Sequence, residues 1–332
     1  MNQLPDLDEL LDASHVVSLP MTVQFRGVRH REAMLFEGPA GWGEFSPFLE
    51  YAAPEASSWL RSAIEAAWEG YPEPVRGSVP VNATLPAVGP ERVEAVLASY
   101  DATHTIKIKV AEKGQDLSQD VARVAEVRRL LPEAAIRIDA NAGWDHEAAM
   151  EALEALAGFS LQYAEQPVPG IGGLARVRAE VQRRGLGILI AADESVRKES
   201  DPLAVARAGA ADLIVIKAQP LGGVRRAIDI VRDAGLPAVV SSALDTSIGL
   251  RQGAALAAAL PELPYACGLA TGSLFSSDIT TDRFIAVNGS LQLRDIAADP
   301  QLLRRHAVGT ERRTWWRQRL AGCLEELQRS TD

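Results

Sequence analysis

Three carboxylates and two lysines end short apolar runs, and together they could bind a cation and move a proton. Asp139, Glu165 and Asp193 each close such a run, while Lys109 and Lys217 close the runs before and after them. Carboxylate oxygens suit a hard cation such as Mg²⁺, which keeps positions open for substrate oxygens. Two lysines that flank a metal can serve as acid and base near neutral pH. These residue types predict metal-assisted proton transfer.

The same five residues recur at regular intervals. The steps from Lys109 to Asp139, Glu165, Asp193 and Lys217 are 30, 26, 28 and 24 residues. A strand, a helix and two loops fill roughly 30 residues in a βαβ unit, so one charge ends each unit. In a (β/α) barrel the carboxyl ends of the strands meet at the face that carries the chemistry. The spacing therefore predicts that the charges converge at one end of a barrel.

A third lysine, Lys107, lies two residues before Lys109 in the run 105–110. Because residues two apart in a strand point to the same face, both lysine side chains share one face of this strand. That face is the lumen of the barrel if the isoleucines pack outward under the helices. A buried ammonium normally has an acid or a substrate anion beside it. Two simpler interpretations stay open: the lysines only neutralise the acids, and any single acid is a helix cap or a solvated loop residue.

The remaining pattern predicts the elements that position these charges. The charged runs are five expected strands, and three more complete the set at 80–87, 238–245 and 265–272. Apolar residues three and four apart predict the intervening helices, at 90–100, 119–131, 145–157, 173–185, 222–235 and 248–260. The fold class expected is α/β, a (β/α) barrel of the modified TIM type at 79–272.

The two ends of the chain predict a second domain. Residues 1–50 read as an antiparallel meander of strands and turns rather than helix, and a helix follows at 54–68. Glycines and prolines at 69–78 indicate a linker. We expect an α+β capping domain built from residues 1–78 and completed by the C-terminal tail, 273–332.

The tail has its own signals. Residues 282–293 resemble a hairpin that turns on Asn288 and Gly289, and 310–329 read as a terminal amphipathic helix. Trp315 and Trp316 in that helix are expected to be core or interface residues. We expect the tail to pack on the N-terminal segment.

Composition excludes several classes of function. The 332 residues are 47% hydrophobic and 23% charged, which is ordinary for a soluble globular protein. A net charge of −10 without a basic run argues against nucleic acid or an anionic membrane as a partner. No apolar run reaches the roughly 18 residues of a membrane helix, and the acidic start lacks a signal-peptide pattern. Cys267 and Cys323 are too few for a disulfide framework, so we expect a cytoplasmic protein.

The motifs in order resemble those of a known family. They read KIK (107–109), DAN (139–141), EQP (165–167), DES (193–195) and a lysine before GG (222–223). This set resembles the enolase superfamily, specifically its muconate lactonising enzyme subgroup and most closely the o-succinylbenzoate synthase family. GWGE (41–44) and SSALDTSIGL (241–250) resemble the capping-domain signature and the loop after the seventh strand, although relatives often have Glu where Asp245 stands.

The resemblance implies a role for each charged residue. Asp139, Glu165 and Asp193 would be ligands of Mg²⁺, with Mn²⁺ as a substitute ion. Lys109 would remove the α-proton of a small carboxylate substrate, and Lys217 would face the ene-diolate from the opposite side. The reaction implied is syn dehydration of 2-succinyl-6-hydroxy-2,4-cyclohexadiene-1-carboxylate to o-succinylbenzoate, a step of menaquinone biosynthesis.

The resemblance also implies supporting residues. Lys107 would support the pKa of its neighbour Lys109. Positions beside the metal ligands are matched by Asn141, Gln166 and Glu194, and substrate contacts would include Ser241 and Ser242.

Specificity would come from two capping-domain loops, around Phe25–Arg31 and Phe45–Ala53. In the second, Phe48 and Tyr51 could cover the substrate ring or merely pack the domain interface.

Other functions use the same residues. N-acylamino acid racemases, dipeptide epimerases and muconate cycloisomerases share the subgroup, but CGLATGSL at the eighth strand lacks the DxD usual in dipeptide epimerases. From a different class, Lys217 could be the Schiff-base lysine of an aldolase, although three carboxylates would then be in excess. A barrel that only scaffolds partners would not need both lysines and all three acids. The oligomeric state stays open.

Overall fold

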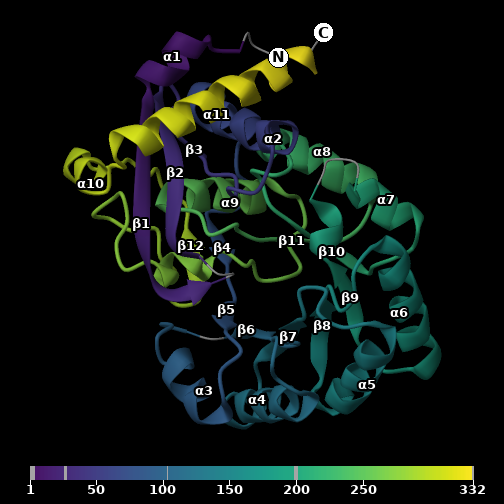
Figure 1. The fold of residues 1–332 in the computed structure, drawn as a ribbon. Helices are drawn as coiled ribbons and strands as arrows, with labels where there is room; N and C mark the ends of the chain where they lie inside the picture. Colours follow the sequence, from purple (N-terminus) through teal and green to yellow (C-terminus); the bar gives the residue numbers. More distant parts are fainter. Residues whose placement is uncertain (1–3, 26–27, 103, 198–200, 331–332) are drawn as a thin grey trace.

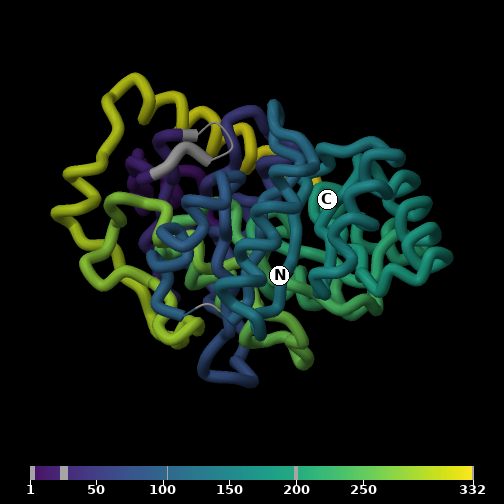
Figure 2. The backbone as a smooth tube through the Cα atoms, turned by 90° about the horizontal axis from the view of Figure 1, so that it is seen from below, coloured from purple at the N-terminus to yellow at the C-terminus, as the bar shows by residue number. Residues whose placement is uncertain are grey.

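The computed structural model describes residues 4–25, 28–102, 104–197 and 201–330. Its two parts are a curled parallel sheet with helices around it, and a smaller α+β part built from both chain ends (Figure 1). Seen from below, the first and last parts of the chain lie together on one side and the middle of the chain on the other (Figure 2). Within the described ranges, no helix is both long and apolar enough to cross a membrane.

Parallel strands form the barrel in sequence order. The sheet order runs from β11 back to β5, and the strands are β5 (Ala83–Leu85), β6 (Thr105–Lys109), β7 (Ala135–Asp139), β8 (Leu161–Glu165), β9 (Leu189–Ala192), β10 (Leu213–Ile216) and β11 (Ala238–Val240). The eighth stave is shorter than expected: residues 265–272 contribute only two parallel bridges, Val81 to Cys267 and Ser241 to Gly268, before a 3₁₀ turn begins at Ala270. The bridges still close the barrel between β11 and β5.

Gly268 explains this short closure. A Cβ at that position would lie 2.6 Å from Ser241 Oγ, so glycine leaves room for the Ser241 side chain where the two segments meet. Asn82 N donates to Cys267 O at 2.9 Å, and Gly268 N donates to Val240 O at 2.8 Å. The expected eighth strand was therefore wrong as a full strand, while its position in the barrel was right.

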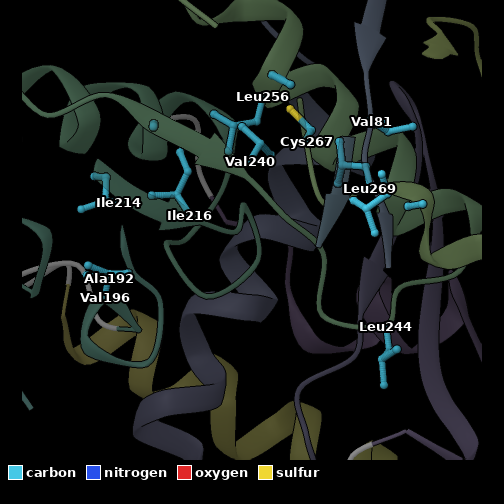
Figure 3. Close-up of a cluster of buried hydrophobic side chains, with 14 of the residues drawn as sticks. Val81, Ala192, Val196, Ile214, Ile216, Val240, Leu244, Leu256, Cys267 and Leu269 are labelled. Carbon is cyan, nitrogen blue, oxygen red and sulfur yellow. The ribbon is translucent and has the colours of Figure 1, made fainter. Parts of the chain in front are cut away.

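The helices match the periodic segments to within a few residues. Around the barrel they are α3 (Pro90–Leu97), α4 (Leu117–Leu130), α5 (His146–Leu156), α6 (Ile171–Arg184), α7 (Asp201–Arg207), α8 (Val224–Ala234) and α9 (Ser247–Ala259). The short α7 was not expected from the sequence. Val240 of β11, Leu256 of α9 and Cys267 lie together in the buried core between sheet and helices (Figure 3).

The capping domain is an antiparallel meander covered by helices from both chain ends. Strands β1 (Ser14–Phe25), β2 (Val28–Gly38) and β3 (Gly41–Phe45) pair in that order. Helix α2 (Ala53–Ile64), which continues as the π-helical turn η1 (Glu65–Glu69), packs on them together with α11 (Thr310–Arg329). The expected meander, the helix at 54–68 and the packing of the tail on the N-terminal segment are confirmed.

Trp316 shows how the tail is fixed. It is fully buried, its ring meets Phe45 edge to face with centroids 5.8 Å apart, and its Nε1 donates to Glu32 Oε2 at 2.7 Å. Trp315 is half-buried beside it. The expectation that both tryptophans are core or interface residues is confirmed.

Two local expectations were wrong. Residues 1–50 contain a helix, α1 (Leu7–Asp12), because the Asp6 side chain caps it by accepting from Glu9 N at 2.9 Å while Leu10 is buried. The turn at Asn288 and Gly289 forms with positive φ at both residues.

Among the described residues, the arms beside that turn pair only at one antiparallel bridge, Val287 with Ser290. The strand after the turn, β12 (Ser290–Gln292), pairs along its length with β4 (Ser78–Pro80), so the expected hairpin was wrong beyond this one bridge. This pairing buries Leu291 against Val79, whereas Ile285 and Val287 in the arm stay exposed. A helix α10 (Pro300–Arg305) follows in the tail.

Gly43 tests the packing of the meander on its helix. A Cβ there would lie 2.2 Å from the Ala63 carbonyl oxygen, so Gly43→Ala should push β3 and α2 apart. We expect the free energy of unfolding to fall by about 1–3 kcal/mol. Gly77→Ala is the matched control, because nothing lies within 4 Å of its Cβ position. Equal urea midpoints for the two variants would contradict the close-packing explanation.

Candidate active site at the carboxyl ends of the barrel strands

The strand register places the charged residues on adjacent staves. Lys109, Asp139 and Glu165 are the last residues of β6, β7 and β8, and each is the lateral partner of the next. Asp193 and Lys217 come directly after β9 and β10. Parallel strands of similar length end at one edge, so five separate βα units deliver their charges to one mouth.

The lysines and carboxylates form alternating ion pairs in that mouth. Lys107 Nζ lies 2.8 Å from Asp139 Oδ2 and 2.7 Å from Glu165 Oε1. Lys109 Nζ lies 2.5 Å from the same Asp139 oxygen. On the other side, Lys217 Nζ contacts Asp193 Oδ1. The two outer lysines therefore approach the mouth from different staves and pair with different acids.

Burial makes these pairs perturb one another's protonation. Burial alone would raise the pKa of Asp139, but the charges of Lys107 and Lys109 hold it well below its usual range. Burial raises the pKa of Glu165 to about 8, and the charge of Asp139 adds to that rise while Lys107 opposes it. Opposite shifts on adjacent carboxylates are common where a site must accommodate different charge states.

The lysine pKa values also diverge. Burial lowers the pKa of Lys109, with Asp139 opposing the shift and Lys107 adding to it. Burial would lower the pKa of Lys107 too, but its contacts with Asp139 and Glu165 raise it well above the ordinary value. The two lysines of the KIK motif thus differ, and Lys109 is the one displaced toward a neutral amine.

Three polar residues hold the loops beside the acids. Lys109 Nζ donates to Asn141 Oδ1 at 2.7 Å, and Asn141 Nδ2 donates to Glu194 Oε1 at 3.0 Å. Gln166 Oε1 accepts from the backbone N–H groups of Asp193 and Ser195 at 3.0 and 3.1 Å. These contacts join the turns after β7, β8 and β9. The loop after one strand therefore helps to fix the orientation of the acid on the next strand.

A cavity opens between these charges and the capping domain. The charged residues that line it are the three lysines, Asp139 and Asp193. It is also lined by Phe48, Ser241 and Ser242. Tyr51 does not: its ring packs on Phe48 and Trp59, with centroids 5.8 and 6.2 Å away. Of the two aromatic residues expected near the substrate, one reaches the cavity and the other supports it. The first expected loop, Phe25–Arg31, includes residues 26 and 27, which lie outside the described residues.

Five further residues line the cavity that the sequence did not indicate: Thr84, Ala243, Leu244, Gly268 and Thr271. Thr84 lies in β5 and faces Lys107 across the register, and Thr271 follows the eighth stave. The signal that could have found them is their place near strand ends, the same signal that located the charges. Threonine and leucine at such a place are common for other reasons, so type alone gave no indication.

The GG pair at 222–223 turned out to serve a protein carboxylate. Glu65 Oε1 accepts from Arg225 N at 3.0 Å, and Glu65 Oε2 accepts from Val224 N. A Cβ at Gly223, which has φ of 120°, would lie 2.0 Å from Glu65 Oε2. Gly223 is thus a turn residue, and its lack of a side chain also leaves room for the Glu65 carboxylate of the capping domain to bind the start of α8.

A second, larger cavity of about 670 Å³ lies away from this mouth. Tyr100 lines it together with residues 281–287 of the tail, on the outer side of β5. None of the strand-end charges lines that space. The chemistry-bearing residues thus select the smaller cavity as the candidate active site.

The buried bridge made by Lys107 generates a stability prediction. Lys107→Ala leaves two buried carboxylates without their shared cation, so in metal-free buffer the free energy of unfolding should fall by about 3–5 kcal/mol. Lys113→Ala removes an exposed lysine and should change it by less than about 0.5 kcal/mol. Urea unfolding of both variants measures the difference, and an unchanged midpoint for Lys107→Ala would show that the bridge is dispensable.

Comparisons with known proteins agree with the fold. Residues 16–67 match the model described as "Enolase N-terminal domain-like", and 91–298 match "Enolase C-terminal domain-like". Among solved structures, muconate lactonizing enzyme from Pseudomonas putida is similar with a TM-score of 0.73 and 21% identity, covering 89% of this chain and 98% of that one. Muconate cycloisomerase from Pseudomonas fluorescens gives 0.75 over the same shares, also at 21% identity. These two likenesses show the fold.

Closer relatives identify the family. The o-succinylbenzoate synthase of Mycolicibacterium smegmatis is 50% identical over 97% of this chain and 98% of its own length. That of Mycobacterium marinum is 49% identical over 97% of both chains. The chain therefore belongs to the enolase superfamily and, within it, to the family of the o-succinylbenzoate synthases.

Proposed function

We propose that this protein is a dehydratase that converts 2-succinyl-6-hydroxy-2,4-cyclohexadiene-1-carboxylate into o-succinylbenzoate in menaquinone biosynthesis. The observation that carries the proposal is the convergence of three lysines and two acids on one cavity, with Glu165 paired to Lys107 beside it, in a chain half-identical to synthases of that name. A cavity lined by cations suits a small carboxylate. The substrate is thus a small molecule of the class expected from the sequence.

Lys109 is the base in this proposal. Its lowered pKa favours the neutral amine, which takes the proton from the substrate carbon that bears the carboxylate. The electron pair of that C–H bond then enters the carboxylate as an ene-diolate. Next, the pair returns to form the ring double bond, the C–O bond breaks, and Lys109 gives its proton to the departing hydroxide, which leaves as water.

Lys217 stabilises the intermediate from the other side. Its side-chain nitrogen lines the same cavity and contacts Asp193, so Lys217 faces the substrate where negative charge develops. A cation held by a carboxylate is a poor Schiff-base nucleophile, and this contact argues against the aldolase interpretation. Lys107, bridged to two acids, acts as the fixed charge beside the base.

Asp139, Glu165 and Asp193 are the proposed ligands of a divalent metal. Three carboxylates on successive staves are a donor set for a hard cation, and Glu165 Oε2 is buried without a hydrogen-bond partner among the described residues. Family membership points to a divalent ion, and we infer Mg²⁺, with Mn²⁺ as a substitute. When bound, the ion supplies charge that stabilises the ene-diolate.

The present contacts of the acids add a requirement. In the part of the chain that the structure describes, no three acidic or histidine side chains are already arranged around one metal position. Asp139, Glu165 and Asp193 instead contact lysine ammonium groups. Ligation therefore needs the lysines to release some of these oxygens, which frees their amines for substrate.

Metal dependence is the first test of this function. Chelation should abolish dehydration and added Mg²⁺ should restore it, while Asp193→Asn should lower kcat/KM by about 10²-fold or more because an anionic ligand is lost. The measurement is ultraviolet absorbance of the aromatic product across a Mg²⁺ titration, with Asp233→Asn, an exposed acid of α8, as control. Full activity in metal-free buffer would overturn the metal assignment.

Proton exchange is the second test. A substrate analogue without the leaving hydroxyl should exchange its α-proton in D₂O with the wild-type protein, and exchange should fall by about 10³-fold in Lys109→Ala. NMR follows the exchange, with Lys113→Ala as the control. Exchange that persists in Lys109→Ala would assign the base elsewhere. Racemisation of an N-acylamino acid faster than dehydration would favour the racemase, which shares this proton transfer.

A further inference from the structure

The loop between β11 and α9 has a strained backbone where it lines the cavity. Leu244 has φ of 62°, a left-handed conformation that is unfavourable for a residue with a side chain such as leucine. Its side chain is buried and lines the same cavity as the catalytic lysines. A strained residue persists only when its surroundings hold it, so the contacts of this loop identify what shapes the cavity wall.

Arg31 of the capping domain makes those contacts. It is buried, its Nε donates to Leu244 O at 3.1 Å and its Nη2 donates to Ala243 O at 3.3 Å. The same guanidinium lies 4.5 Å from the centroid of the Phe48 ring and donates to Ser46 O. One side chain thus joins the residue that forms the cavity's roof, Phe48, to the residue that forms its wall, Leu244.

Glu44, the last residue of the GWGE motif, fixes the other end of the loop. Its carboxylate accepts from Thr246 N at 3.1 Å, Thr246 Oγ1 at 2.6 Å and Gly249 N at 3.0 Å, so it caps the start of α9. A Cβ at Gly249 would lie 2.8 Å from Glu44 Oε2, which makes this approach dependent on glycine. The motif therefore acts on the barrel loop rather than inside its own sheet.

Asp245 completes a buried cluster between these two anchors. Gln219 Nε2 donates to Asp245 Oδ1 at 3.1 Å, and Ala243 N donates to Oδ2 at 3.3 Å. Burial raises the pKa of Asp245. Burial, together with the negative charge of Asp245, raises the pKa of Glu44 to about 7. Two acids and one arginine buried together are costly, and an apolar interface would stabilise the fold better. Such a cluster indicates a requirement on geometry.

We propose that Arg31 and Glu44 are positioning residues, which hold the 243–246 loop in the strained conformation that completes the substrate cavity. Through them the capping domain sets where Leu244 and the adjoining Ser241 and Ser242 stand. This inference rests on the proposed function for its kinetic consequence. Its structural consequence, the order of the loop, does not depend on which substrate is used.

A second contact between the domains provides a matched control. Glu65 of η1 caps α8 as Glu44 caps α9, and both carboxylates are buried. No residue in the Glu65 contact lines the cavity. Glu65→Gln therefore weakens the domain interface without touching the cavity wall.

The kinetic experiment compares Arg31→Met, Glu44→Gln and Glu65→Gln with the wild type, well below each melting temperature. The first two should raise KM for the cyclohexadiene carboxylate by about tenfold, with a smaller effect on kcat, because the wall is displaced but the lysines and acids are not. Glu65→Gln should lower the melting temperature with KM unchanged. Arg31→Lys keeps the positive charge and N–H donors on one nitrogen but loses the separate Nε and Nη2 positions, so it should recover part of the affinity. It also covers the case in which Arg31→Met does not fold. KM changes that follow the melting temperature in all variants would overturn the proposal.

Hydrogen exchange of the peptide that spans residues 241–249 gives a readout without substrate. Exchange there should accelerate in Arg31→Lys and Glu44→Gln and stay at the wild-type rate in Glu65→Gln. Unchanged exchange in the first two variants would overturn the positioning role. If the wild type failed to dehydrate the substrate while the exchange pattern appeared as expected, the proposed function would fall and the positioning role would stand.

Discussion

Buried lysines and carboxylates that share one barrel mouth are the constraint on which the rest of this structure depends. An unpaired charge in that position would be very costly, so each lysine needs an acid and each acid needs a cation. A run of contacts from Lys109 through Asp139 and Lys107 to Glu165, across the three neighbouring strands β6, β7 and β8, meets that need. It also allows the total charge of the site to change, because the pKa of Asp139 is lowered and the pKa of Glu165 is raised.

The capping domain answers a second constraint, the closing of a mouth whose chemistry must exclude water. It does so through side chains that cap barrel helices, Glu44 on α9 and Glu65 on α8, each reaching its helix past a glycine. Backbone N–H groups at a helix start are strong partners for a carboxylate. The interface is therefore anchored at defined points, and the Glu44 anchor holds the end of the loop whose residue Leu244 lines the substrate cavity.

Local departures from expectation share one physical cause, which is competition for partners. The strand at 290–292 joins β4 because that pairing buries Leu291, although the turn before it has the chemistry of a hairpin. The eighth stave stops after two bridges because the chain turns into η4. The helix at 7–12 forms because Asp6 caps it and Leu10 finds a place in the core. For the strand at 290–292, a distant contact decided what a short segment did.

The sequence by itself determined the barrel, the order of its units and the six charged residues, since apolar runs of strand length end in one charge per βα unit. The motifs were also sufficient to identify the family. Only the tertiary structure decided which aromatic residue reaches the cavity, that Thr84, Leu244 and Thr271 line it, and that Glu44 and Arg31 hold its wall. Periodicity reports the direction of a side chain within its own element. Contacts between residues about 200 positions apart, such as Arg31 with Leu244, depend on how two domains dock, and no local pattern encodes that.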